Sequence, residues 1–282
     1  MELRLTTLSE NTALARPRGL LAEWGLSILV EVDNLRILLD TGQSISTVHN
    51  AVALGIALSQ IDKIVLSHGH YDHTGGLQQV LNRVRKEVEV IAHPEVWAAK
   101  YAYNPNEGSY SYIGIPLQRE ELESPGATFR LTREPVWLTE NIVTSGEIPM
   151  VTDYETIDPG LCVKEGDEFL PDPLRDDQAL FIKTEQGLVV ILGCGHRGVI
   201  NTLRHAQKLT RMEPIHTVVG GTHLIRASEV QMELTIAELK EIGVQQLGPC
   251  HCTGMGTATR LAQEFGEGFF FNNASTSITF DA

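Results

Sequence analysis

The most informative segment of the chain is Ser67-His68-Gly69-His70-Tyr71-Asp72-His73-Thr74-Gly75-Gly76. It follows a short apolar segment, residues 64–66, which we expect to be a strand. Imidazole nitrogens and carboxylate oxygens are good ligands for zinc and similar divalent ions. In a turn after a strand, the two imidazoles at 68 and 70 can point the same way, and the side chains at 72 and 73 can reach a second ion. The spacing therefore predicts a metal site rather than a polar loop with incidental histidines.

The segments around this stretch predict a layered α/β protein. Residues 27–32 and 35–39 have the pattern of two strands in a hairpin, and residues 45–58 have that of a helix. Apolar side chains over 77–84 fall on one helical face, and a strand is expected at 88–92. Strand–helix–strand is the unit from which layered α/β sheets are built.

In the second half of the chain, reactive side chains stand where predicted strands stop. The segments that follow the predicted strands 188–192, 217–219 and 244–247 are, in order, Gly193-Cys194-Gly195-His196, Gly220-Gly221-Thr222-His223 and Pro249-Cys250-His251-Cys252. Between the halves, residues 100–176 are rich in Pro, Gly, Tyr and Glu, with short strand-like pieces such as 136–138. We interpret this region either as excursions at the sheet edges or as a flap over the site.

Composition and charge exclude several classes of protein. The 282 residues are 42% apolar and 21% charged, which is ordinary for a globular chain. The net charge of −14 argues against a nucleic-acid partner. No apolar run reaches the roughly 18–20 residues of a membrane helix, and the N-terminus does not have the pattern of a signal peptide. Four cysteines are too few for a disulfide framework. We expect a cytoplasmic protein with a small-molecule substrate, in an oligomeric state that the sequence leaves open.

The stretch 67–77 resembles the signature of the metallo-β-lactamase-fold superfamily, and Asp40-Thr41-Gly42 is similar to that superfamily's first motif. The three strand-end segments of the second half narrow the resemblance to the 7,8-dihydropterin-6-ylmethyl-4-(β-D-ribofuranosyl)aminobenzene 5′-phosphate synthase-like subgroup. The resemblance implies an α/β protein with the four-layer αββα fold, two β-sheets sandwiched between helices. It also implies one domain over 1–282 with a variable insertion or flap at about 100–176.

The resemblance further implies a pair of divalent ions, with zinc expected first and manganese or iron as the alternatives. The implied ligands are His68 and His70 for the first ion, and Asp72, His73 and His251 for the second. Cys194 stands where relatives place a bridging Asp or a Cys. Asp40 would support a ligand histidine from behind.

The sequence departs from the family pattern at one ligand. A Gly-His-Thr-Pro-Gly element would precede strand 179–183, but Asp176-Asp177-Gln178 occupies that stretch. We expect His196 to replace the missing third ligand of the first ion, because it lies two residues beyond Cys194 on the same strand end. Cys194 itself has a second interpretation as a small buried apolar residue. Its place between two glycines and beside His196 favours the role of ligand.

Four residues outside the ligand set are candidates for substrate contacts. His223 is interpreted as a substrate-facing donor or accessory ligand, or else as a turn or satisfied core histidine. Trp24 and Tyr71 fit pocket walls or core. Arg197 could attract an anionic substrate group, although a lone arginine is more often a solvated surface charge.

The candidate metal ligands and substrate contacts together support three functional hypotheses. The first is a dinuclear metal-dependent hydrolase, in which a metal-bound hydroxide attacks a carbonyl or phosphoryl centre of a small polar substrate. Asp72 would orient the nucleophile and His223 would contact the substrate. The second is the transferase that the subgroup name implies, joining a pterin methyl carbon to a ribofuranosylaminobenzene phosphate. The third is a metal-binding module without catalysis.

Overall fold

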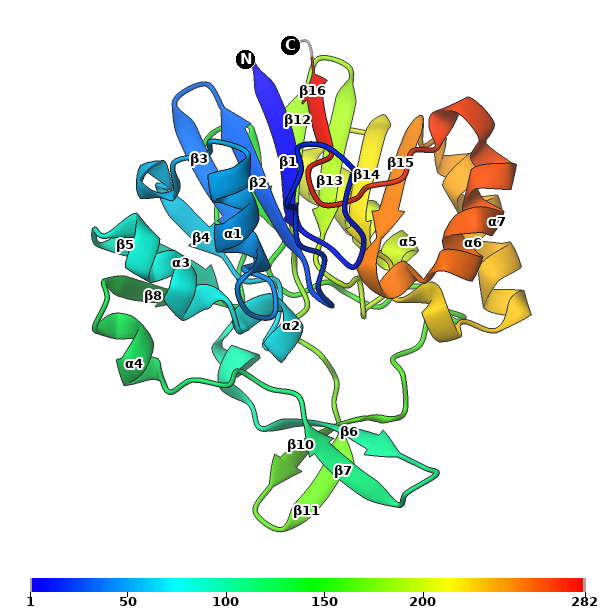
Figure 1. Ribbon diagram of the computed structural model, residues 1–282. Coiled ribbons are helices and arrows are strands. Elements are labelled where there is room, and N and C mark those ends of the chain that lie inside the picture. Colours follow the sequence, from blue (N-terminus) through cyan, green and yellow to red (C-terminus); the bar gives the residue numbers. More distant parts are fainter. Residues whose placement is uncertain (1, 281–282) are drawn as a thin grey trace.

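A computed structural model describes residues 2–280, in which two large β-sheets lie face to face (Figure 1). The first sheet runs in the order β16 (Ser277–Phe280), β1 (Leu3–Ser9), β2 (Ser27–Val32), β3 (Leu35–Leu39), β4 (Lys63–Val65), β5 (Val88–Ala92) and β8 (Ala127–Leu131). The second runs in the order β15 (Gln246–Cys250), β14 (Ile215–Gly221), β13 (Gly187–Leu192), β12 (Ala179–Thr184) and β9 (Ile142–Thr144). Strands β3, β4, β5 and β8 are parallel, as are β13, β14 and β15.

Helices cover the outer face of each sheet (Figure 1). The first sheet is covered by α1 (Ser46–Ala53), α3 (Leu77–Val84) and α4 (Arg119–Glu123), and the second by α5 (Val199–Thr210), α6 (Glu229–Ile242) and α7 (Met255–Phe265). The short helix α2 (Tyr71–Thr74) lies at the lower edge of the first sheet. Within residues 2–280, none of the helices is long and apolar enough to cross a membrane.

The alternation of side chains along each strand creates the layers. On β13, Val189 and Ile191 pack in the core between the two sheets, while Val190 packs against the helices behind the second sheet. On β2, Val30 faces the second sheet and Leu29 faces the helices behind the first. Strands buried on both faces need continuous apolar runs, which is what these segments contain. The predicted αββα architecture is confirmed.

Some predicted boundaries are wrong. The helix predicted over 45–58 ends at Ala53, because the chain turns at Gly55 (φ +71°) before a short 3-10 turn at Leu58–Gln60. The strand predicted over 244–247 begins only at Gln246 and continues to Cys250, since pairing with β14 sets its register. Residues 136–138 form an isolated bridge through Trp137 rather than a strand.

Residues 100–176 contribute both to the large sheets and to a separate small sheet. Their strands β8 and β9 occupy edges of the large sheets, as the first interpretation of this region predicted. Helix α4 of this region packs behind the first sheet. The remaining strands build a third sheet in the order β11 (Glu168–Pro171), β10 (Leu161–Glu165), β6 (Lys100–Asn104) and β7 (Ser109–Tyr112), which lies below the large sheets (Figure 1). We call this the insertion sheet.

Candidate metal centre

The predicted ligands come together because most of them follow parallel strands. The carboxyl ends of parallel strands meet at one edge of a sheet, so residues far apart in sequence become neighbours. The loop after β4 contributes His68 to His73, the loop after β13 contributes Cys194 and His196, and β15 leads into His251. All seven predicted ligands are at most 7% exposed.

His68, His70 and His196 form one group, which we call the histidine cluster. The Nε2 atom of His68 lies 3.0 Å from Nδ1 of His70. The ring of His196 lies 4.8 Å from that of His68 and 4.9 Å from that of His70, measured between centroids. His196 therefore lies beside His68 and His70, and its role as a third ligand stays a prediction.

Asp72, His73, Cys194 and His251 form a second group, which we call the mixed cluster. The Nε2 atom of His73 lies 3.1 Å from the Cys194 sulfur and 3.2 Å from Nε2 of His251. The Asp72 carboxylate lies 3.2 Å from Nε2 of His251. The Cys194 sulfur also lies within 4.8 Å of ligand atoms of His68 and His196. The Cys194 sulfur therefore lies between the two clusters.

Asp40 holds the clusters from behind. Its Oδ2 atom lies 2.6 Å from Nδ1 of His73 and accepts a hydrogen bond from the Ser67 hydroxyl at 2.7 Å. The Ser67 oxygen in turn lies 2.9 Å from Nδ1 of His68. Both imidazoles are thereby oriented through Nδ1, which leaves Nε2 toward the cluster, an arrangement typical of metal-binding histidines.

His251 has support that sequence reasoning missed. Its backbone N–H donates to the Glu10 carboxylate at 2.8 Å, and its Nδ1 atom lies 3.0 Å from Oδ1 of Asn11. These residues follow β1, and no motif marks them. Their role becomes visible only when β1 is placed near the end of β15.

Burial and neighbouring charges give the histidines of the two clusters different pKa values. Burial lowers the pKa of His70 to about 3 and holds that of His196 well below its usual range, so these imidazoles are neutral. Burial also opposes the charged form of His73, but the Asp40 and Asp72 carboxylates outweigh it and raise the pKa of His73 to about 9. The histidine cluster thus offers neutral donors, whereas the mixed cluster pairs a positively charged His73 with the Asp40 and Asp72 carboxylates.

Several buried nitrogen atoms at this place have no hydrogen-bond partner. Within residues 2–280 these include Nε2 of His70 and both ring nitrogens of His196 and His223. Buried polar atoms without partners are uncommon, and each requires an explanation. Convergent imidazole, carboxylate and thiol donors suit zinc or a similar divalent ion. The residues therefore fit the ions that the sequence predicted.

The two clusters open into a cavity of about 330 Å³. Trp24 and Tyr71 line it, which favours the first of their two interpretations, and Ala102 of the insertion sheet and Ile225 add to its apolar walls. His223 also lines the cavity, with its ring 4.0 Å from that of His196. Its unpartnered nitrogens exclude the interpretation of a satisfied core histidine.

The prediction that Arg197 attracts a substrate anion is wrong. Its guanidinium donates to the backbone carbonyls of Ile148 and Pro173, at 2.5 and 2.6 Å, and it does not line the cavity. The arginine at the cavity is Arg226, which is exposed and pairs with Asp158 at 3.4 Å.

Cys252 is a further residue at this site, for which the sequence suggested no role. Its sulfur accepts the backbone N–H of His223 at 3.2 Å and lies within 4.8 Å of the Cys194 sulfur. Cys252 lines the cavity, whereas Cys250 packs in the core between the sheets. The Cys-x-Cys pattern around His251 was the available signal, and only one of its two cysteines reaches the site.

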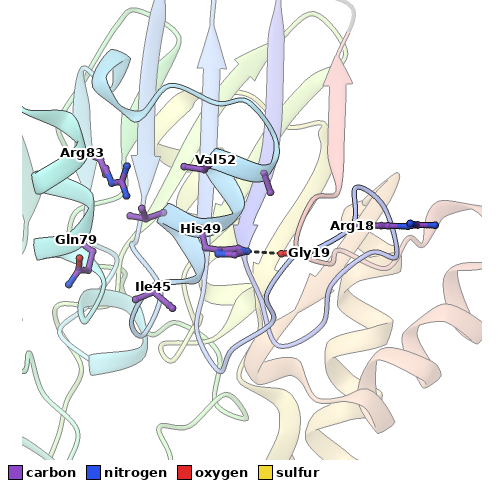
Figure 2. A pocket seen from close by; sticks show the side chains of 9 residues that line it. Arg18, Gly19, Ile45, His49, Val52, Gln79 and Arg83 are labelled. Atoms are coloured by element: carbon purple, nitrogen blue, oxygen red, sulfur yellow. Dashed lines mark hydrogen bonds between the residues drawn. The ribbon is translucent and has the colours of Figure 1, made fainter.

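A second hollow, of about 550 Å³, lies around α1 and is separate from this centre. Figure 2 shows Gln79 and Arg83 on one side of α1 and the loop of Arg18 and Gly19 on the other. His49 lies 2.6 Å from the Gly19 carbonyl oxygen and so has a partner. Among residues 2–280, the groups of His, Cys, Asp and Glu close enough to hold an ion all include Cys194, so this hollow has none.

Comparison with known proteins agrees with this geometry. Residues 25–200 match the metallo-beta-lactamase superfamily, and the chain belongs to it. The chain is 33% identical to the 7,8-dihydropterin-6-methyl-4-(beta-D-ribofuranosyl)-aminobenzene-5'-phosphate synthase of Methanocaldococcus jannaschii, over 92% of this chain and 90% of that protein. Within the superfamily it belongs to the family of this synthase.

Two further relatives extend the comparison. The chain is 34% identical to Uncharacterized protein MJ0448 of Methanocaldococcus jannaschii, over 91% of this chain and 93% of that protein. The structure of the present chain is similar to that of Tm1679, a metal-dependent hydrolase of the beta-lactamase superfamily, with a TM-score of 0.84 and 29% identity. That match covers 99% of this chain and 100% of the other.

Proposed function

We propose that this chain is a metal-dependent hydrolase that acts on a carbonyl or phosphoryl centre of a small polar substrate. The proposal rests mainly on the two adjacent clusters of buried donors, several without partners, at the floor of one cavity. His68, His70 and His196 would hold one divalent ion, and Asp72, His73, Cys194 and His251 would hold the other, with zinc as the expected metal. Two such ions activate water and stabilise negative charge on the substrate.

The side chains around the ions have distinct proposed roles. Asp72 lies at the junction of the mixed cluster and the cavity, where its carboxylate can accept a proton or hold a water molecule in line with the substrate. His223 faces the same cavity with free ring nitrogens, so it can donate to the substrate. Trp24 and Ile225 contribute apolar surface to the cavity, and Arg226 is placed to attract an anionic group.

A second candidate function is a synthase of the kind that the Methanocaldococcus relative's name describes. The identity of 33% over 92% of the chain favours it. In that case the same ions would assist departure of a leaving group, and the cavity would have to hold two substrates. The apolar walls at Ile113 and Leu161 would suit an aromatic partner.

The two candidates differ in their products. The zinc-loaded protein would be incubated with chromogenic carboxylic and phosphate esters, and separately with a pterin donor and ribofuranosylaminobenzene phosphate. Hydrolysis that disappears in the Asp72→Ala variant supports the first proposal. A conjugate detected by mass spectrometry, without ester hydrolysis, supports the second. Neither product at full metal loading would contradict both and favour a metal-binding module.

A further inference from the structure

Lys100, at the start of β6 in the insertion sheet, is 1% exposed. Lysine is almost never fully buried unless it is paired. Its ammonium donates to the Asp172 carboxylate at 2.8 Å and to Oδ1 of Asp176 at 2.9 Å. Both carboxylates are themselves buried, so the three charges form a closed network in the interior.

The second oxygen of Asp176 extends this network to the metal centre. Oδ2 accepts the backbone N–H of Gly69 at 2.8 Å, and Gly69 is the residue between the ligand histidines at 68 and 70. On another side, a side chain at Gly69 would collide with the carbonyl of Val96. The peptide that separates the two imidazoles is therefore held by a carboxylate and confined by a neighbouring backbone.

Stability alone does not account for such a network. Removing three charges from water costs several kcal/mol per ion, and apolar side chains of the same volume often serve as well or better. What apolar side chains cannot do is accept the Gly69 N–H. The backbone at Gly69 sets how His68 and His70 face each other, and these imidazoles are neutral and have no charge to draw them together.

We propose that Lys100 and Asp176 are positioning residues for the histidine cluster. Lys100 holds the Asp176 carboxylate in place, and Asp176 fixes the Gly69 peptide and with it the spacing of His68 and His70. Asp176 thus belongs to the stretch that lacks the family's ligand histidine, yet it serves the same ion from behind. The inference rests on the proposed metal centre and assigns a supporting role in it to the insertion sheet, through Lys100.

The test compares Asp176→Ala with Asp172→Ala. Each substitution removes one carboxylate partner of Lys100, but only Asp176 contacts Gly69. Cobalt(II) would be titrated into the metal-free proteins. In a His70→Ala background, which lacks a donor of the histidine cluster, the sulfur-to-cobalt charge-transfer band reports on the mixed cluster. In a His251→Ala background, which lacks a donor of the mixed cluster, the cobalt bands report on the histidine cluster, so the two affinities can be measured separately. Unfolding temperatures of the metal-free variants show whether each one folds.

We expect Asp176→Ala to weaken cobalt binding in the histidine cluster by about 10- to 100-fold, the usual effect of losing a group that supports a ligand. The thiolate band should titrate as in the wild type, and Asp172→Ala should leave both clusters near wild-type affinity. Asp176→Asn keeps an acceptor for Gly69 and loses the charge, so it should fall between the two. Lys100→Met should weaken the same cluster as Asp176→Ala.

Equal losses in the Asp172→Ala and Asp176→Ala variants would overturn the inference, as would equal weakening of both clusters. Wild-type affinity in Asp176→Ala would also overturn it while leaving the proposed metal centre intact. If the wild-type protein binds no cobalt at all, the proposed metal centre fails and the inference fails with it. Asp176→Asn and Lys100→Met supply the same comparison if Asp176→Ala does not fold.

Discussion

The histidine cluster and the mixed cluster are neighbours, but the chain builds them with opposite electrostatics. The histidine cluster consists of imidazoles, and burial keeps the pKa values of His70 and His196 low. The mixed cluster contains the Asp72 carboxylate and the Cys194 thiol, and Asp40 lies behind it. A cation gains more from charged donors than from neutral ones when water is excluded. We therefore expect the mixed cluster to bind its ion more tightly.

The difference also concerns how each cluster keeps its shape. In the mixed cluster, attraction between Asp72 and the histidines helps to hold the donors together, and it lowers the pKa of Asp72 despite burial. In the histidine cluster burial outweighs the attraction of His70 to Asp72 and keeps the imidazoles of His70 and His196 neutral, so the backbone must impose the geometry. The Gly69 N–H held by Asp176 and the Arg197 N–H held by Asp177 are the contacts that do this.

The largest expected effects come from removing one donor of each cluster. His70→Ala should lose the ion of the histidine cluster, and Asp72→Ala the ion of the mixed cluster, each with a fall in turnover of more than about 100-fold. Metal analysis of the purified variants and assay of the active substrate measure both effects. Full wild-type metal content and activity in either variant would contradict the assignment of that donor to its cluster.

A smaller effect is expected from the group behind the mixed cluster. Asp40→Asn removes the negative charge at His73 while keeping an amide of similar shape. Metal affinity of the mixed cluster should fall by about 10- to 100-fold. Titration of the thiolate-to-cobalt band measures this change, with Asp172→Ala as the control that alters a carboxylate remote from His73. Unchanged affinity in Asp40→Asn would show that the charge at His73 is irrelevant.

The smallest expected effect concerns Asp177, whose carboxylate accepts the backbone N–H of Arg197, the residue after His196. Burial, with one oxygen unpartnered, raises the pKa of Asp177 to about 7. Because the folded state binds this proton more tightly than the unfolded state, the free energy of unfolding contributed by Asp177 falls as pH rises from about 4 to about 7.

The amide of the Asp177→Asn variant does not titrate, so the variant does not lose this contribution to the free energy of unfolding as pH rises. The stability difference between Asp177→Asn and the wild type should therefore shift in favour of the variant by up to a few kcal/mol over this range, and then become constant. Chemical unfolding of the metal-free proteins at several pH values measures it. A difference that does not change with pH would contradict the raised pKa of Asp177.

Much of this architecture follows from local patterns in the sequence. Burial requires apolar residues at regular positions along a strand or helix. Strands β2 and β13 and helix α3 could therefore be predicted from the sequence. The loop from His68 to His73 was readable because its ligands are close together in sequence. His196 could be placed because it lies two residues beyond Cys194 on the same strand end.

What the sequence did not reveal depends on contacts between distant segments. Glu10 and Asn11 support His251 from about 240 positions away, and Lys100 reaches Asp176 from the insertion sheet. A lone arginine such as Arg197 carries no sign of which carbonyls will accept its hydrogen bonds. Polar partners of this kind have no periodicity, so only the assembled fold identifies them.

The most direct test of the central claim is the metal content of protein purified without added ions. If the two clusters are a dinuclear centre, elemental analysis should find about two equivalents of zinc, manganese or iron per chain. Dialysis against a chelator should remove the more weakly held ion first. Protein that contains no bound metal, and that takes up none when incubated with zinc, would contradict the account.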